Sequence, residues 1–164
     1  MTGEISPVHA VEAVKTYTNR YSFYAVEYPE TWRAKETGKA TAFYSPRKSK
    51  EDKFSENVQI VVEDLSQVPG NVSVVDYHRK GVGAAQKLLS DFRALEEVRT
   101  QWSGRDTIVM LYSATMRGER FKFKDYKFMV DRTAYVLTYC ATAADFDTYL
   151  PAAERLIRSL RVSP

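Results

Sequence analysis

The chain has 164 residues, of which 44% are hydrophobic and 13% aromatic, enough to bury the core of a single domain. Its 24 basic and 21 acidic residues give a formal net charge of +3 and are interspersed, which argues against a nucleic-acid-binding protein. A single cysteine excludes an internal disulfide and a cysteine-based zinc site. No apolar run approaches the roughly 18 residues of a membrane span.

The N-terminal segment carries little sign of packing. Residues 1–16 are expected to form a tail with a slight helical tendency, so the domain is predicted to span residues 17–164. The tail contains no signal-peptide hydrophobic stretch. This is compatible with a cytosolic protein or with the mature form of an exported one.

Three strands are predicted in the first half of the domain. Residues 21–28 favour a strand that ends at Pro29, after which the large indole of Trp32 is expected to fold back onto the sheet. Residues 41–44 favour a short second strand. Residues 57–65 alternate apolar and polar side chains, which predicts a third strand with one face in the core.

A helix is predicted next. Ser73 and Asp76 have the spacing of a capping box, which indicates a helix start at Ser73. Gly81 and Gly83 each cost about 1 kcal/mol relative to alanine inside a helix. They indicate either close packing of the helix on the sheet or a break that divides it.

The last third of the chain is predicted to form hairpins. Residues 93–102 and 107–115 favour strands joined by a turn at Gly104, and residues 107–115 are apolar on both faces, as in a central strand. Within residues 121–130 the apolar positions change parity. That change predicts a bulge near Asp125 or a strand end that enters the sheet late.

The C-terminal segment predicts a buried strand that leads into an amphipathic helix. From Thr133 onward both side-chain parities are largely apolar, as in a strand covered on both faces. Thr142 and Asp145 suggest a capping box, and Pro151 predicts a kink or a restart of the helix. Together these elements predict an α+β fold: a mostly antiparallel sheet of about six to seven strands sandwiched between helices (α/β/α).

Few side chains suggest catalysis. His78 lies beside Asp76 on the predicted helix, Cys140 in the most apolar strand and His9 in the tail. None of them belongs to a recognisable catalytic or zinc-binding cluster. Residues 81–86 lack the third glycine of a dinucleotide fingerprint. We therefore predict no catalytic, cofactor-binding or metal-binding residue.

Basic side chains are the candidates for contact with a partner. They lie in the charged loop of residues 47–56 and in the hairpin of residues 117–124. One interpretation is a solvated rim that protects a sheet edge, another is a docking patch for an acidic protein surface, and single-stranded nucleic acid is a poorer version of the second. The candidate partner-binding residues are Arg47, Lys48, Lys50, Lys53, Arg117, Arg120, Lys122 and Lys124.

A series of aromatic, proline and aliphatic positions along nearly the whole chain resembles a known family. These positions are Tyr17, Phe23, Tyr28-Pro29, Trp32, Phe43, Ser45-Pro46, Glu56-Asn57-Val58, Gly104, Tyr135-Val136-Leu137-Thr138, Phe146, Tyr149, Ile157 and Ser159-Leu160. Their order resembles the PsbP family, whose wider fold group is called Mog1/PsbP-like. The resemblance implies a non-enzymatic accessory protein that docks onto a larger protein complex, as PsbP does at photosystem II.

The same resemblance implies an extracytoplasmic or thylakoid-lumen location, although the chain shows no targeting segment. We expect a protein that is monomeric in isolation. The alternative function is that of a small-ligand-binding protein or an enzyme, with a pocket between the sheet and a helix where His78 or tyrosine hydroxyls would act.

Overall fold

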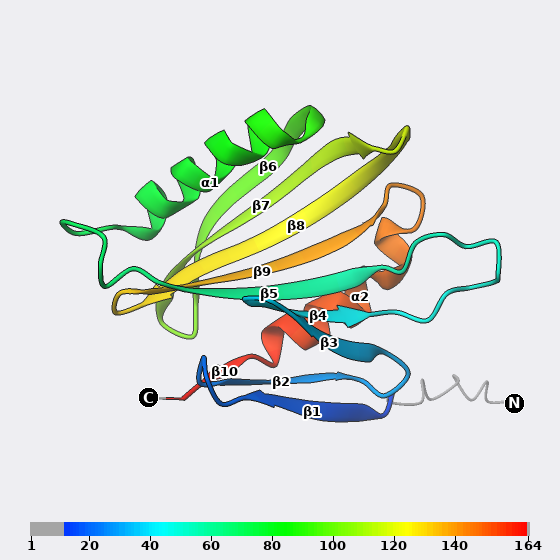
Figure 1. Cartoon of the computed structure of the whole chain (residues 1–164), viewed down its shortest axis with the longest axis horizontal. Coiled ribbons are helices and arrows are strands. Elements are labelled where there is room, and N and C mark those ends of the chain that lie inside the picture. The colour runs from blue at the N-terminus through cyan, green and yellow to red at the C-terminus, as the bar shows by residue number, and fades with distance from the viewer. Residues whose placement is uncertain (1–11, 164) are drawn as a thin grey trace, which may run out of the picture.

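The computed structural model describes residues 12–163, which form ten strands and two helices (Figure 1). The strands are β1 (Val14–Asn19), β2 (Tyr24–Pro29), β3 (Arg33–Thr37), β4 (Ala40–Tyr44), β5 (Asn57–Asp64), β6 (Ser90–Trp102), β7 (Arg105–Met116), β8 (Glu119–Val130), β9 (Thr133–Thr142) and β10 (Arg161–Val162). The helices are α1 (Val74–Leu88) and α2 (Phe146–Arg158).

The strands form two antiparallel sheets. Seven of them make one sheet in the order β3-β4-β5-β9-β8-β7-β6, and β1, β2 and β10 make a smaller one in the order β1-β2-β10. Helix α1 lies on one face of the large sheet, over β6, β7 and β8, whereas α2 and the small sheet lie on the opposite face (Figure 1). The predicted α+β fold, with a mostly antiparallel sheet between helices, is confirmed.

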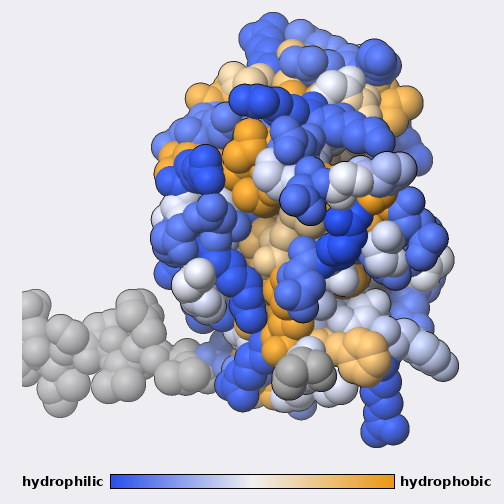
Figure 2. Space-filling view, turned by 90° about the vertical axis from the view of Figure 1, so that its left-hand side faces the viewer, coloured by the Kyte–Doolittle hydropathy of each residue, from blue (hydrophilic) through white to orange (hydrophobic). Residues whose placement is uncertain are grey.

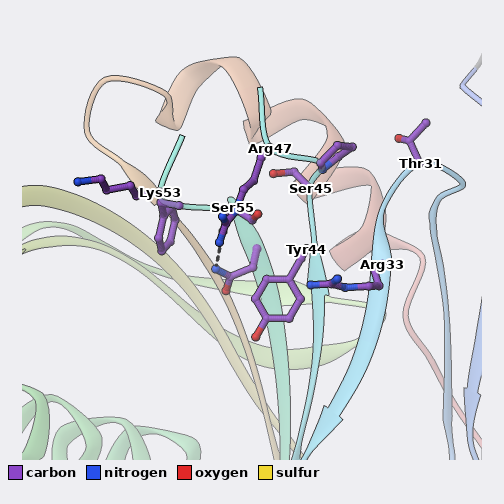
Figure 3. Close-up of a pocket in the computed structure, with 10 residues that line it drawn as sticks. Thr31, Arg33, Tyr44, Ser45, Arg47, Lys53 and Ser55 are labelled. Carbon is purple, nitrogen blue, oxygen red and sulfur yellow. Dashed lines mark hydrogen bonds between the residues drawn. The ribbon is translucent and has the colours of Figure 1, made fainter. Parts of the chain in front are cut away.

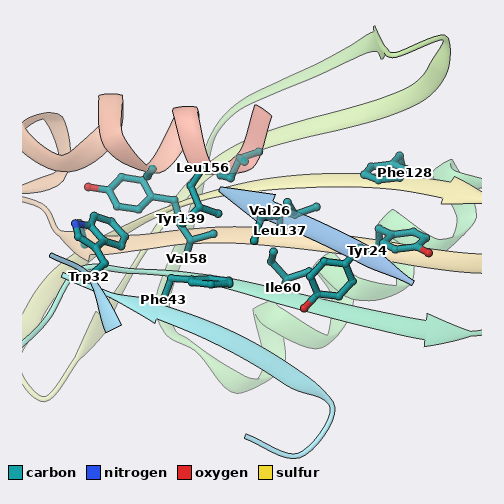
Figure 4. Packing of buried hydrophobic residues seen from close by; sticks show 14 of the residues in the cluster. Tyr24, Val26, Trp32, Phe43, Val58, Ile60, Phe128, Leu137, Tyr139 and Leu156 are labelled. Carbon is teal, nitrogen blue, oxygen red and sulfur yellow. The ribbon is translucent and has the colours of Figure 1, made fainter. Parts of the chain in front are cut away.

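Strand β9 lies at the centre of this arrangement and contributes to both faces. Because side chains alternate along a strand, Tyr135, Leu137 and Tyr139 face α2, and Leu137 and Tyr139 are fully buried. They pack in the main hydrophobic core with residues of β2, β4, β5 and α2 (Figure 4). Cys140 faces the other way, into a smaller core beneath α1. The predicted two-faced strand is therefore correct.

Helix α2 uses its apolar side to close the main core. Phe146, Ala153, Leu156 and Ile157 are buried there. The helix continues through Pro151, so the predicted restart did not occur. The predicted capping box is formed only in part. The Asp145 backbone N–H donates to the Thr142 hydroxyl at 3.3 Å, but the helix begins after Asp145, whose side chain makes no capping hydrogen bond.

Helix α1 begins with the predicted capping box. The Ser73 hydroxyl accepts a hydrogen bond from the Asp76 backbone N–H, and the Asp76 carboxylate accepts one in return from the Ser73 backbone N–H. The helix continues without a break through Gly81 and Gly83. Only its residues Val74 and His78 are buried. Much of α1 is therefore open to solvent, and the helix covers only part of the sheet.

Three expectations for the N-terminal half need correction. The first strand of the domain begins at Val14 rather than after residue 16, and the helical tendency predicted for the tail falls largely outside the described residues. Strand β2 starts later than predicted because Phe23, with a φ of 53°, still belongs to the turn that precedes it. Strand β3 was not predicted.

Strand β8 contains the most informative error. Its register with β7 and β9 is continuous from Phe121 to Phe128, so the predicted bulge near Asp125 does not exist. Instead, Asp125 and Lys127 occupy buried positions on the face toward α1. The register shifts of the sheet lie in β6, near its N-terminal end.

Candidate functional site

The two basic segments singled out in the sequence lie at the same end of the molecule. The loop between β4 and β5 and the turn between β7 and β8 both extend toward this end (Figure 1). Phe54 of the loop packs against Phe121 of β8, with ring centroids 4.8 Å apart. The two ends of the loop are held together by a hydrogen bond from the Ser45 hydroxyl to the buried Glu56 carboxylate, at 2.9 Å. We call this region the basic end.

A polar hollow of about 430 Å³ opens at the basic end (Figure 3). Arg33 of β3 and the loop residues Arg47 and Lys53 line it, together with Tyr44. The Arg33 guanidinium lies 6.0 Å from the centre of the Tyr44 ring. Within residues 12–163, no carboxylate lies within ion-pairing distance of these three cations. The hollow therefore presents three cations without an ion-pair partner in the described chain, although the Asp52 carboxylate of the same loop interacts with Arg47 at longer range.

The other loop and turn candidates differ in their surroundings. Lys48 pairs with Asp145, just before α2, and its ammonium lies 5.7 Å from the centre of the Tyr149 ring. This pairing raises the pKa of Lys48. Lys50 and Arg117 are exposed, and Arg117 has the positive φ of 51° that the turn requires. Lys48 thus ties the loop to α2, while Lys50 and Arg117 extend the charged surface.

The basic residues of strand β8 project from one face, as predicted, but this face is partly covered. Arg120 pairs with Asp91 at 2.7 Å, and the Lys122 ammonium lies 4.9 Å from the centre of the Phe146 ring. Lys124 pairs with Glu154 of α2 at 2.7 Å. Each of the three side chains therefore contacts a partner within the chain.

A second concavity lies between α1 and the large sheet. It has a volume of about 580 Å³ and a mostly apolar lining. Figure 2, which views the side of the molecule where α1 begins, shows apolar surface recessed between hydrophilic residues. The lining residues are Val61, Glu63, Leu65, Val68, Val72, Asp76, Tyr77, Lys80, Gly81, Ala84, Lys127 and Val136. We call it the α1 cavity. The α1 cavity lies between the sheet and a helix, which is where a small-ligand-binding protein or an enzyme was expected to have its pocket.

A buried row of polar side chains runs beneath α1. The Lys127 ammonium lies 3.3 Å from the Asp125 carboxylate and 3.3 Å from Nδ1 of His78. Asp125 also accepts a hydrogen bond from the Tyr112 hydroxyl at 3.3 Å, and His78 Nε2 lies 2.5 Å from the Glu97 carboxylate. Burial and the neighbouring Asp125 carboxylate raise the pKa of Tyr112 well above its usual range.

The hydrogen bonds assign the tautomer of His78. An ammonium group can only donate, so Nδ1 must accept from Lys127. With this assignment Nε2 carries the hydrogen and donates it to Glu97. His78 faces a different concavity, shared with Glu97, and does not line the α1 cavity. Lys127 reaches the wall of the α1 cavity, whereas the histidine considered in the sequence does not. Tyr77 also lies in the lining, and its hydroxyl donates to Glu63 at 2.8 Å.

Sequence reasoning missed this polar row for a clear reason. The alternation of β8 is continued on the α1 side by Phe121, Phe123, Asp125 and Lys127, of which the last two are polar. If the two-residue alternation is followed strictly from Phe121, Asp125 and Lys127 fall on the buried face. Their presence there was the available signal of a buried ion pair, and it was interpreted as a bulge.

Cys140 is buried. Burial, with the negative charges of Glu56 and Asp125, raises the pKa of its thiol to about 12. A thiol that stays protonated at neutral pH is a poor nucleophile.

Residues 12–163 contain no cluster of three or more His, Cys, Asp or Glu side chains that could hold a metal ion. In the same part of the chain, neither helix is long and apolar enough to span a membrane.

The arrangement of the elements is shared with solved structures. No protein-family model matches the sequence, and no curated protein sequence does. PA94, a protein of unknown function from Pseudomonas aeruginosa, is 18% identical, with a TM-score of 0.65 over 92% of this chain and 98% of that one. A two-helix α+β sandwich of this topology is thus found in other proteins.

Two further solved structures identify the fold as PsbP-like. The cyanobacterial PsbP, CyanoP, from Synechocystis sp. PCC 6803 is 13% identical, with a TM-score of 0.63 over 99% of this chain and 98% of that one. LpqN of Mycobacterium tuberculosis, involved in cell envelope biogenesis, is 14% identical, with a TM-score of 0.64 over 97% and 90%. The fold is therefore PsbP-like, as the sequence resemblance predicted, and identities this low show the fold alone.

Proposed function

We propose that the protein is a non-enzymatic accessory protein that docks onto a larger protein complex through its basic end. The observation that carries this proposal is the hollow lined by Arg33, Arg47 and Lys53, whose charges have no carboxylate partner within residues 12–163. Unpaired surface cations favour an acidic partner surface and speed the encounter with it. Lys50 and Arg117 are also exposed, in the loop and the turn that extend toward the basic end.

The surroundings of the reactive side chains support a role without catalysis. Cys140 is buried and its thiol has a raised pKa. The His78 ring is buried with both nitrogens in hydrogen bonds, to Lys127 and to Glu97. A general base or nucleophile needs contact with substrate. The Cys140 thiol is thus shielded and protonated at neutral pH, and both nitrogens of His78 are occupied by contacts within the chain.

The structural likeness to CyanoP makes a photosynthetic complex, with photosystem II first, the partner to test, and with it an extracytoplasmic or thylakoid-lumen location. The likeness to LpqN makes a complex that acts in cell envelope biogenesis a second partner to test. In both cases the proposed action is docking. The protein is proposed to be a monomer when free of its partner.

Capture from the native source tests the proposal. The wild-type protein and a triple variant, Arg33→Glu, Arg47→Glu and Lys53→Glu, are used as baits. A control triple variant, Arg20→Glu, Lys35→Glu and Lys39→Glu, makes the same change in net charge at exposed positions outside the hollow. We expect the partner to be captured by the wild type and the control and lost with the first variant.

The expected loss also has a salt signature. Docking that rests on exposed charges weakens as ionic strength rises, because the Debye length falls from about 10 Å at 0.1 M salt to about 3 Å at 1 M. Equal capture by all three proteins, or capture insensitive to salt, would remove the basic end as the docking surface. Turnover of a substrate by the isolated protein would contradict the non-enzymatic role.

A further inference from the structure

The α1 cavity has the size and lining of a small-molecule site. At about 580 Å³ it falls within the range of roughly 300–1,000 Å³ that is typical of ligand pockets. Its walls are mostly aliphatic and come from β5, β9, the loop before α1, and α1 itself. Such a lining favours an apolar ligand, because burial of apolar surface drives its binding.

The wall formed by the loop is firmly held. The Arg132 guanidinium donates hydrogen bonds to the backbone carbonyls of Leu65 and Gly70, each at 2.8 Å, and to that of Val68. Leu65 and Val68 are themselves lining residues. Three charge-assisted hydrogen bonds from one side chain keep the loop in place, so the cavity exists before any ligand enters.

Lys127 supplies the polar contact. The residue is only 6% exposed, yet it reaches the cavity wall. Its ammonium group has three N–H donors, and within residues 12–163 it contacts two partners, Asp125 and His78. Gly81, which also lines the cavity, lies next to the ammonium: a Cβ atom there would be in van der Waals contact with Nζ, at 3.6 Å. One donor thus remains for a ligand.

The charges at the cavity argue against an anionic ligand. The Asp125 carboxylate already balances Lys127. At the rim, Lys80 is accompanied by Glu63 and Asp76. A carboxylate placed next to Lys127 would therefore gain no net positive field, and would lose its hydration on burial. A neutral acceptor satisfies the free N–H without that cost.

From this geometry we propose that the α1 cavity binds an uncharged apolar molecule that carries one hydrogen-bond acceptor, a carbonyl group, which accepts from the Lys127 ammonium. The aliphatic walls enclose the apolar body, and Lys127 orients the carbonyl. This binding function goes beyond the docking role and does not depend on it, since the cavity and the basic end are formed by different residues.

The probe for the test is Prodan, an uncharged naphthalene with one ketone, whose emission shifts to the blue in apolar surroundings. We expect saturable binding with a blue shift to the wild-type protein. Gly81→Leu should fill the space beside Lys127 and reduce affinity by at least about tenfold. Gly83→Leu is the matched control on the same helix: it lies outside the lining of the α1 cavity, and a Cβ there meets no atom within 4 Å.

Two further measurements test the chemistry. Methyl dodecanoate should displace Prodan at least about tenfold more effectively than dodecanoate, since only the ester has an uncharged carbonyl. The variant Asp125→Leu/Lys127→Met removes the donor together with its counter-charge. It should bind Prodan about tenfold more weakly, the size of one hydrogen bond.

Each outcome decides the proposal. Absence of saturable Prodan binding, or equal binding by Gly81→Leu and Gly83→Leu, would overturn the cavity as the site. Displacement by dodecanoate as strong as that by its methyl ester would overturn the uncharged ligand class. Circular dichroism and urea midpoints measured on the same samples show that each variant is folded, so that a loss of binding is a loss of the site.

Discussion

Replacing Lys127 with methionine would leave the Asp125 carboxylate buried without its cation. Both side chains are 8% exposed and their charged groups lie 3.3 Å apart. Removing one partner of a buried ion pair costs about 3–5 kcal/mol of unfolding free energy, because the remaining charge keeps its desolvation penalty. For a domain of this size, about 2–4 °C per kcal/mol, the melting temperature should fall by about 6–20 °C.

A second variant separates the cost of the unpaired Asp125 charge from the cost of lost packing. In Asp125→Leu/Lys127→Met both charges are gone, and only neutral groups such as the Tyr112 hydroxyl lose a partner. We expect the double variant to be at least about 2 kcal/mol more stable than Lys127→Met alone. The control is Lys124→Met on the same strand, whose ion pair with Glu154 is more exposed, at 24% and 23%. That pair should contribute no more than about 1 kcal/mol.

Urea unfolding followed by circular dichroism and tryptophan fluorescence measures all four proteins, and agreement between the two probes checks two-state behaviour. A cost below about 1 kcal/mol for Lys127→Met would refute the buried pair. A double variant no more stable than the single one would refute the electrostatic origin of the cost and point to packing alone.

Four other outcomes are expected. Cys140, whose thiol pKa is raised to about 12 by burial, should react with iodoacetamide only as the protein unfolds, and rapid labelling of the native protein would contradict its burial. Ser73→Ala removes the capping box of α1 and should cost about 1 kcal/mol, seen as a melting temperature about 2–4 °C lower. Arg132→Met should speed hydrogen exchange in the loop before α1, whose carbonyls it binds, and unchanged exchange would refute that role. Burial opposes ionisation of Glu154, but the hydrogen bonds from Lys124 and Tyr126 and the positive charges of Lys124 and Arg158 together outweigh it and lower the pKa. A lowered folded pKa gives stability that is present above the unfolded pKa and lost as pH falls through the folded one, so Glu154→Gln should flatten the decrease of the urea midpoint between about pH 5 and pH 2.

The parts of the fold that could be predicted are those where one local rule acts alone. The alternation of β5 places Val58 and Ile60 in the core, as expected from a period of two. The capping box at Ser73 depends on residues three apart and was predicted correctly. In both cases tertiary contacts agree with the local preference, so the local signal is enough.

Errors arose where tertiary contacts outweigh a local preference. Strand β3 has one half-buried residue, Ala34, among exposed ones, so its sequence gives little alternation, and it exists because β4 offers a free edge for pairing. Helix α2 passes through Pro151 because the residues on either side of it, Phe146 and Leu156 among them, are held in the core. Propensity at a single position is too small to oppose such burial.

The candidate sites were predictable only in part, because each is assembled from distant segments. The charged loop supplied Arg47 and Lys53, but the hollow also requires Arg33 from the unpredicted strand β3. The α1 cavity needs Lys127 beside Gly81, a contact between β8 and α1 that no spacing rule contains. A buried ionic pair is a weak source of stability, since apolar residues of the same volume serve as well or better. In this chain the pair lies beside an apolar cavity, and Lys127 reaches the cavity wall whereas His78 does not. The proposed ligand contact therefore rests on Lys127 rather than on the histidine beside it.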